Sequence, residues 1–157
     1  MQLTLTPIQD SDIELLSGWL HKDYILQWYH DADEWIHEIK EREGSFNFLF
    51  HYIVLENNRP IGFCQFYDCF DAKEDWYSVE CPNKIYSIDY LIGEENFLGK
   101  GYGKEIIRII TNKIIRDKNP KAIIVQPEED NVASCKALLA NGYIYDLDNN
   151  YYIRQCL

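Results

Sequence analysis

The spacing of apolar residues along the chain alternates between the two-residue period of strands and the 3.6-residue period of helices. Strands are predicted over residues 2–7, 46–55, 60–70, 84–92 and 122–126, with two short strands near 143–145 and 151–154. Helices are predicted after a cap at Asp10 or Ser11, over residues 33–43, after the glycines at 99–103, and from Asn131 onward. This order predicts a mixed α+β fold.

Turn and stop signals set the boundaries of these elements. The polar turn at residues 56–59 separates two aromatic and β-branched runs, so the flanking strands are predicted to form a hairpin. Residues 71–82 are interpreted as a long loop. Asn119 and Pro120 end one helix, and Asn141 with Gly142 is a typical end for the last one. No repeat or linker interrupts residues 1–157, which predicts a single domain.

The formal net charge of the chain is −11. Nucleic-acid binding requires a basic surface, so no nucleic-acid partner is expected. An acidic cleft would attract a small cationic partner, but acidity also favours solubility alone. Charge does not decide between these two interpretations.

Five cysteines are present, an odd number without a C-x-x-C pair, which favours a reducing compartment over a disulfide framework. The first ten residues lack the basic and apolar regions of a secretory signal, and no apolar run is long enough to span a membrane. We therefore expect a cytoplasmic protein without a membrane partner. Both a monomer and a homodimer are consistent with the sequence.

The segment 98–104 is the most informative one, because three glycines and two lysines lie between a predicted strand and a predicted helix. Glycines let the backbone approach a phosphate closely, and a helix N-terminus offers unpaired N–H groups. The segment is not a Walker A loop, and Ile106 occupies the place of the third glycine of a dinucleotide fingerprint. A purely structural glycine turn is the alternative.

Two motifs at a fixed separation resemble the GNAT superfamily of acetyltransferases. Segment 98–103 resembles its coenzyme A loop, Gln/Arg-x-x-Gly-x-Gly/Ala, with Leu98 in the leading position. Downstream, the family pattern Asn-x-x-Ala-x-x-x-Tyr-x-x-x-Gly-Phe is matched by Asn131, Ser134, Leu138, Gly142 and Tyr143. The resemblance implies a mixed, mostly antiparallel sheet, flanked by helices and splayed between its fourth and fifth strands.

The same resemblance implies that the chain binds acetyl-CoA. The residues that it assigns to the cofactor are Leu91, Ile92, Leu98, Gly99, Lys100, Gly101, Tyr102, Gly103, Lys104, Asn131 and Ser134. A backbone N–H near Leu91 or Ile92 is expected to polarise the thioester carbonyl.

Within that superfamily, the chain is similar to the aminoglycoside 6'-N-acetyltransferases over nearly its whole length. The similarity is carried by segments 24–29, 60–63, 75–77 and 86–89. It implies that Asp89 is catalytic and contacts the reacting amine. The residues that it assigns to the substrate are Trp28, Tyr29, Asp75, Trp76, Asp89 and Gln126.

Two positions depart from the pattern of these enzymes. Gln126 replaces an aspartate that helps to hold the antibiotic, and Leu138 replaces a tyrosine proposed to protonate the leaving thiolate. The acceptor is therefore expected to be a cationic small-molecule amine, with an aminoglycoside 6'-amine first. A polyamine, an amino acid derivative or a protein amine is the alternative, and an inactive coenzyme A-binding module is a third possibility.

The proposed chemistry makes demands on Asp89. An ammonium group must lose a proton before it can attack, so Asp89 either takes that proton or holds the ammonium form. The usual pKa of aspartate is near 4, so its action as a base requires burial to raise that pKa.

No metal is expected, since His30, Asp33 and His37 have helical spacing but no evident fourth ligand.

Overall fold

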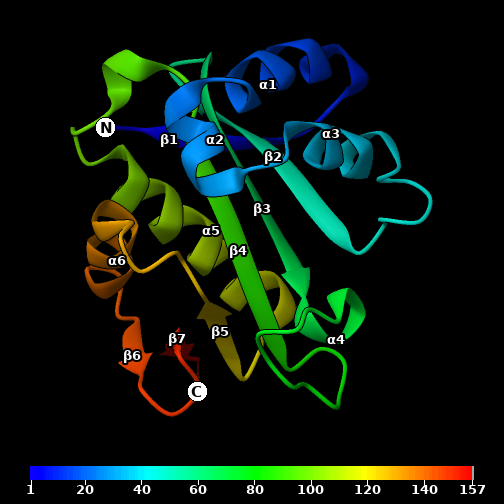
Figure 1. Cartoon of the computed structure of the whole chain (residues 1–157), viewed down its shortest axis with the longest axis vertical. Helices are drawn as coiled ribbons and strands as arrows, with labels where there is room; N and C mark the ends of the chain where they lie inside the picture. Colours follow the sequence, from blue (N-terminus) through cyan, green and yellow to red (C-terminus); the bar gives the residue numbers. More distant parts are fainter. Residues whose placement is uncertain (157) are drawn as a thin grey trace.

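The computed structural model describes residues 1–156 and contains one seven-stranded sheet with the order β1-β2-β3-β4-β5-β7-β6 (Figure 1). Neighbouring strands are antiparallel except for the parallel pair β4 and β5. The strands are β1 (Leu3–Pro7), β2 (Leu49–Glu56), β3 (Arg59–Asp68), β4 (Ile85–Ile92), β5 (Ala122–Val125), β6 (Ile144–Asp146) and β7 (Tyr151–Gln155).

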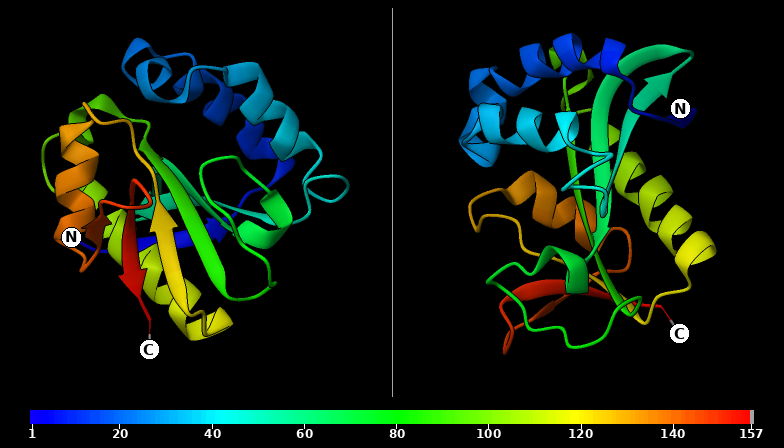
Figure 2. Two further views of the ribbon diagram at one scale, coloured as in Figure 1. Left: turned by 60° about the horizontal axis from the view of Figure 1, so that its bottom comes forward. Right: turned by 90° about the vertical axis from the view of Figure 1, so that its right-hand side faces the viewer.

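Helices cover both faces of the sheet (Figure 2). One face carries α1 (Ile13–Leu20), α2 (Asp23–Tyr29) and α3 (Ala32–Lys40), and the other carries α5 (Tyr102–Lys118) with α6 (Val132–Leu139) packed beside it. The remaining helices are α4 (Cys69–Ala72), η1 (Asp10–Asp12) and η2 (Glu95–Phe97). Among the described residues, no helix is both long and apolar enough to cross a membrane.

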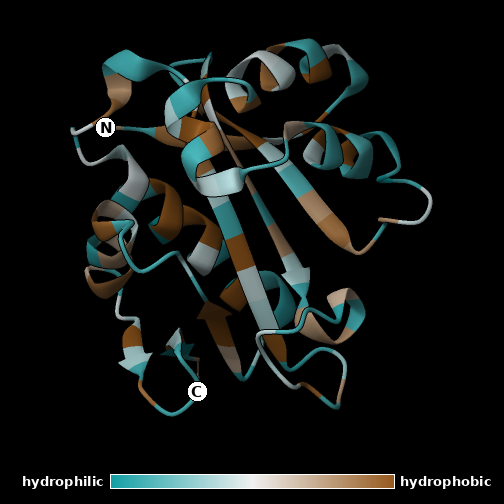
Figure 3. Ribbon diagram, viewed as in Figure 1, coloured by the Kyte–Doolittle hydropathy of each residue, from teal (hydrophilic) through white to brown (hydrophobic). Residues whose placement is uncertain are grey.

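Each helical layer buries its own apolar cluster against the sheet. On the α5 face, Ile106, Ile110 and Ile114 pack with Phe66 and Ile88. On the opposite face, apolar side chains of α1 and α3 pack against Phe63 and Leu91. In Figure 3, hydrophobic positions recur along the central strands and α5, and many positions of the connecting loops are hydrophilic.

The sheet opens between β4 and β5. These strands pair only through Ile85 with Ala122 and Tyr86 with Ile123, whereas β4 continues to Ile92. From Ser87 onward, β4 therefore has one edge without a neighbouring strand. Unpaired backbone groups at such an edge can bind an extended ligand as an added strand. The predicted α+β sheet, splayed between its fourth and fifth strands, is confirmed.

The alternation of side chains across the sheet determines which residues meet. Gln65 and Asp89 are direct partners in the register of β3 and β4, so both point to the face that carries α1, α2 and α3. Tyr90 follows Asp89 and points to the opposite face, where it packs with the α5 cluster. The adjacent residues Asp89 and Tyr90 of β4 thus project into the opening from opposite faces of the sheet.

The structure differs from several of the predicted elements and boundaries. Residues 23–29 form a helix, α2, that the sequence analysis did not separate from its surroundings. The second strand begins at Leu49 instead of residue 46. The third strand ends at Asp68, because the Asp68 carboxylate accepts a hydrogen bond from the Phe70 N–H and begins the short helix α4.

Candidate active site

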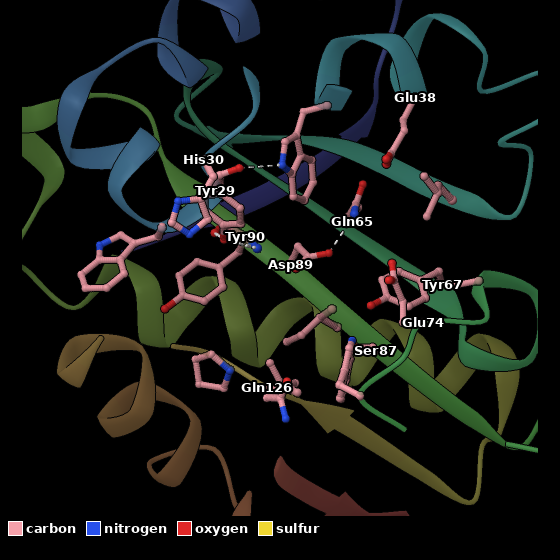
Figure 4. Close-up of a pocket in the computed structure, with 18 of the residues that line it drawn as sticks. Tyr29, His30, Glu38, Gln65, Tyr67, Glu74, Ser87, Asp89, Tyr90 and Gln126 are labelled. Carbon is pink, nitrogen blue, oxygen red and sulfur yellow. Dashed lines mark hydrogen bonds between the residues drawn. The ribbon is translucent and has the colours of Figure 1, made fainter. Parts of the chain in front are cut away.

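A cavity of about 630 Å³ lies at the opening of the sheet. Its walls come from α2, α3, β3, β4 and the segment between β5 and α6, so it is reached from both helical layers (Figure 4). Asp89 borders it from one face of the sheet, and Tyr90 and Ser134 border it from the other. Two ligands that enter the cavity from its two sides can therefore meet beside β4.

Asp89 lies against the cavity and accepts a hydrogen bond of 2.8 Å from the side-chain nitrogen of Gln65 (Figure 4). Burial raises the pKa of Asp89 from 3.8 to about 6, the hydrogen bond from Gln65 lowers it, and the nearby Glu74 carboxylate raises it. A carboxylate with this pKa is mostly ionised at neutral pH and still basic enough to accept a proton. The environment of Asp89 therefore raises its pKa, as its action as a base requires.

Gln65 was not identified from the sequence. Its side chain is 2% exposed, and while its nitrogen donates to Asp89, its oxygen Oε1 is buried without a partner. An unpaired buried acceptor is costly, and an N–H group from a substrate would satisfy it. The orientation of Gln65 depends on strand register, for which the local sequence carries no signal.

Carboxylates dominate the charge of the cavity. Besides Asp89, the lining includes Glu34, Glu38, Glu74 and Glu128, and none of the described lining residues is a lysine or arginine. Burial and the neighbouring carboxylates, Glu34 first, raise the pKa of Glu38 to about 7. Crowded acidic groups favour a ligand with several positive charges, because such a ligand relieves their mutual repulsion.

The acidic loop was only partly predicted. Trp76 lines the cavity as expected, but Asp75 is exposed and does not line it. The chain turns after α4, where Lys73 adopts a left-handed φ of 53°, and Glu74 borders the cavity in place of Asp75. Glu74 therefore borders the cavity, and Asp75, which the sequence assigned to the substrate, does not.

Aromatic side chains complete the walls. Trp28 and Tyr29 line the cavity as predicted, and Trp35 contacts Tyr29 edge to face with a centroid distance of 5.1 Å.

Gln126 also lines the cavity, and its side-chain nitrogen donates to the Asn150 carbonyl oxygen at 2.7 Å. A neutral amide committed to the backbone gives weaker attraction for a cation than a carboxylate at the same place.

The open edge of β4 is held by two tyrosines of α2. The Tyr29 hydroxyl bonds to both the N–H and the carbonyl oxygen of Tyr90, and the Tyr24 hydroxyl donates to the Ile92 carbonyl oxygen at 2.8 Å. The backbone groups of Tyr90 and Ile92 therefore face the opening.

Leu91 has the opposite orientation. Its carbonyl oxygen lies against Gly62 of β3, where an added Cβ would approach it to 2.4 Å, and its side chain is buried. Backbone groups alternate between the two edges of a strand. Of the two residues expected to polarise the thioester, Ile92 keeps that position and Leu91 does not, and Tyr90 shares the open edge.

The glycine turn leads directly into α5. Gly99 and Gly101 have φ values of 71° and 86°, which side chains disfavour, and Gly101 immediately precedes the first residue of α5, Tyr102. Lys100 and Lys104 are exposed beside it, as is Leu98. Free N–H groups at the helix N-terminus, two positive φ values and two lysines suit a pyrophosphate.

The remaining cofactor residues lie between this turn and α6. Gly103 lies against the Tyr90 ring, from which an added Cβ would be 3.4 Å away. The Asn131 side chain accepts a hydrogen bond from the Ser134 N–H at 3.3 Å and begins α6. Asn131 and Ser134 both line the cavity. The chemistry of these residues fits coenzyme A, whose pyrophosphate the turn and whose extended arm the open edge of β4 would hold.

Among residues 1–156, no group of three or more His, Cys, Asp or Glu side chains is arranged to hold a metal ion. His30 instead pairs with Glu128 at the mouth of the cavity.

The sheet that splays between β4 and β5, the glycine turn before α5 and the partly buried carboxylate of Asp89 at the opening are the features expected of an acyltransferase that uses a nucleotide-linked acyl donor. Residues 9–147 match the family described as acetyltransferase (GNAT) domain. The chain belongs to this family and is an acetyl-CoA-dependent N-acetyltransferase.

Relatives with a stated activity point to one subgroup. The chain is 23% identical over 147 residues to aminoglycoside N(6')-acetyltransferase type 1 of Klebsiella pneumoniae, a match that covers 90% of this chain and 73% of that protein. The corresponding protein of Serratia marcescens matches with the same identity and coverage. The predicted resemblance to aminoglycoside 6'-N-acetyltransferases is thus confirmed.

Solved structures share the fold. Aminoglycoside acetyltransferase AAC(6')-Ib in complex with coenzyme A and kanamycin has a TM-score of 0.83 at 22% identity, covering 98% of this chain and 95% of that chain. Spermidine N-acetyltransferase from Vibrio cholerae in complex with coenzyme A and spermine has a TM-score of 0.73 at 14% identity, covering 92% and 82%.

Proposed function

We propose that the enzyme acetylates an amine of a polycationic small molecule, with the 6'-amine of an aminoglycoside as the first candidate. The observation that carries this proposal is the cavity, in which Asp89 lies among four further carboxylates and aromatic walls. Carboxylates bind the ammonium groups of such a molecule, and aromatic faces cover its apolar surfaces. The relatives named above act on substrates of this class.

In the proposed reaction, Asp89 and Gln65 act together on the amine. Asp89 binds the ammonium group and takes its proton, and the pKa of about 6 permits both roles near neutral pH. Gln65 fixes one oxygen of Asp89, and its free oxygen is available to accept a second N–H of the amine. Both groups lie on one face of β3 and β4, so the amine is directed toward the opening.

The other half of the site holds the acetyl donor. The turn at Gly99 and Gly101 with Lys100 and Lys104 would bind the pyrophosphate, and the open edge of β4 would pair with the extended arm. When bound, acetyl-CoA supplies an acetyl group activated as a thioester. The Ile92 N–H at this edge would stabilise the negative charge on its oxygen, since the Tyr90 N–H already donates to the Tyr29 hydroxyl.

A polyamine is the second candidate acceptor. Gln126 supports it, because a neutral amide stands where the antibiotic enzymes resembled by the sequence carry a carboxylate, and it is bonded to the Asn150 backbone. A flexible polyamine requires fewer fixed contacts than an aminosugar, since its charges can distribute over Glu34, Glu38 and Glu74. The spermine complex of a structural neighbour is consistent with this alternative.

The cellular setting is part of the proposal. We expect a cytoplasmic enzyme, monomeric or homodimeric, that binds neither nucleic acid nor membranes. The five free cysteines and the net charge of −11 support this setting. An aminoglycoside acceptor would make antibiotic resistance the biological role.

The test is the release of free thiol from acetyl-CoA with a panel of aminoglycosides and polyamines. Asp89→Asn is compared with Asp71→Asn, which removes a charge from an exposed residue of α4 outside the cavity. We expect one class of amine to drive release, a loss of roughly 10²-fold or more in Asp89→Asn, and near-normal release in Asp71→Asn. Equal release by the wild type and Asp89→Asn would overturn the role of Asp89.

A further inference from the structure

Acetyl transfer leaves a thiolate that must gain a proton, and the structure narrows the choice of donor. Leu138, on the inner face of α6, is fully buried in the α5 cluster and has no proton to give. Asp89 is occupied with the amine on the other face of the sheet. The donor must reach the part of the cavity between the glycine turn and α6.

Tyr90 reaches that part of the cavity from β4. Its hydroxyl donates to the Ser134 side-chain oxygen at 3.2 Å, and Ser134 lies on the same face of α6 as Leu138, one turn closer to the N-terminus of the helix. The same hydroxyl lies beside the first turn of α5, since a Cβ added at Gly103 would be 3.6 Å from it. Tyr90 and Ser134 both line the cavity.

We propose that the Tyr90 phenol is the general acid of this enzyme, giving its proton to the sulfur of the leaving thiolate. The proposal rests on the proposed function, because it assumes that acetyl transfer takes place. Asp89 and Tyr90 are consecutive residues on opposite faces of β4, so one strand supplies the base for the amine and the acid for the thiolate.

The protons and electrons balance in this scheme. As the carbon–sulfur bond breaks, the sulfur keeps the bonding pair, the O–H bond of Tyr90 breaks and an S–H bond forms. The ammonium group gives one proton to Asp89 before the amine attacks, and its second excess proton passes to solvent after the C–N bond has formed. Asp89 then releases its own proton to solvent. The Tyr90 phenolate then regains a proton from water, directly or through the Ser134 hydroxyl.

The surroundings of Tyr90 suit an acid. Burial raises the pKa of Tyr90 and keeps the phenol protonated at neutral pH, whereas the hydrogen bond with Ser134 lowers that pKa. The positive end of α5 stabilises the phenolate once the proton has left. The thiol has a pKa near 8.5, so the transfer is uphill and needs this stabilisation.

Tyr90→Phe removes the proton donor and keeps the ring, and Tyr86→Phe is its matched control. Tyr86 lies four residues earlier on the same face of β4 and also loses a single hydroxyl hydrogen bond, at 3.3 Å to Asn83. The first measurement is kcat with saturating substrates. We expect a loss of roughly 10²-fold in Tyr90→Phe and near-normal turnover in Tyr86→Phe.

The second measurement does not depend on turnover. Dissociation constants of coenzyme A and desulfo-coenzyme A, which lacks the sulfur atom, are compared by calorimetry. If the Tyr90 hydroxyl contacts the sulfur, the wild type and Tyr86→Phe prefer coenzyme A by about three- to tenfold, and Tyr90→Phe loses the preference.

The outcomes separate this inference from the proposed function. If the wild type turns over and Tyr90→Phe matches Tyr86→Phe, the acid is another group and only this inference fails. If Tyr90→Phe binds both cofactors more weakly with an unchanged ratio, its role is structural and the inference is again wrong. If the wild type releases no thiol with any amine, the proposed function fails instead.

Discussion

Asp89 is the residue at which activity and stability conflict. Burial raises its pKa from 3.8 to about 6, so the folded protein binds the proton more tightly than the unfolded chain. The free energy of unfolding therefore decreases as pH rises through this range, and above it the ionised Asp89 destabilises the fold. Asp89→Asn should raise the free energy of unfolding at about pH 8 by about 1 to 3 kcal/mol while abolishing activity.

Denaturant unfolding at two pH values checks this prediction. Near pH 4, Asp89 is protonated in the folded protein, so the difference between wild type and Asp89→Asn should largely disappear. A variant that is less stable than the wild type at about pH 8 would contradict the assigned burial of Asp89.

Burial is the main cause of the raised pKa of Asp89, and Gln65 lowers that pKa through one hydrogen bond of 2.8 Å. That bond favours the ionised carboxylate, so Gln65→Leu should raise the pKa of Asp89 further. The rise of kcat/KM with pH, expected near pH 6 in the wild type, should move to higher pH in the variant. An unchanged pH profile would show that the bond does not act on the catalytic carboxylate.

Glu38 gives substrate binding a pH dependence of its own. Its pKa is raised to about 7 by burial and then by Glu34, Asp89 and Glu74 in order of importance. Above that pH its charge attracts the cationic acceptor, and below it the group is neutral. Glu38→Gln should therefore raise KM for the acceptor several-fold at about pH 8 and change it little at about pH 6. Equal effects at both values would argue against a role of this charge.

At the scale of elements, substitutions in the turn before α5 should change the affinity for the cofactor without changing the rate of the chemical step. Lys100 and Lys104 lie beside a helix N-terminus. Lys100→Ala should weaken the binding of coenzyme A by roughly five- to tenfold, because one charge near the phosphates is lost, and should leave kcat nearly unchanged. Calorimetric titration checks the affinity. If a Lys100→Ala, Lys104→Ala double variant bound coenzyme A with unchanged affinity, the phosphates would not bind at this turn.

Local pattern predicted the elements that carry strong periodicity. The hairpin of β2 and β3, the long helix α5 and the glycine turn followed from spacing and turn residues. The helix α2 was missed because it has only seven residues and all of them except Asp23 and Gln27 are apolar or aromatic, which leaves no clear helical period. The end of β3 depended on the cap at Asp68, which competes with strand propensity.

The site was predicted less completely than the fold, for a physical reason. Asp89 and Gln126 were identified by resemblance, but Gln65, Glu38 and Tyr90 reach the cavity through strand register and helix packing. Such contacts join residues distant in sequence, so no local pattern reports them. Glu74 borders the cavity in place of Asp75 for a local reason, since the preceding residue, Lys73 at the end of α4, has a left-handed conformation.

For the whole molecule, the net charge of −11 and the acidic cavity act on the two substrates in opposite ways. The field attracts a cationic amine and repels an anionic acyl donor. Raising salt from about 20 to about 200 mM should lower kcat/KM for the amine several-fold and should not lower kcat/KM for acetyl-CoA to the same extent. Parallel losses for both substrates would contradict electrostatic steering by the protein.

The most direct test of the account is amine-dependent release of free thiol from acetyl-CoA, measured for the wild type and Asp89→Asn with aminoglycosides and polyamines. The account predicts release that requires a polycationic amine and is lost in Asp89→Asn. Tight binding of coenzyme A without release for any amine of a broad panel would contradict it.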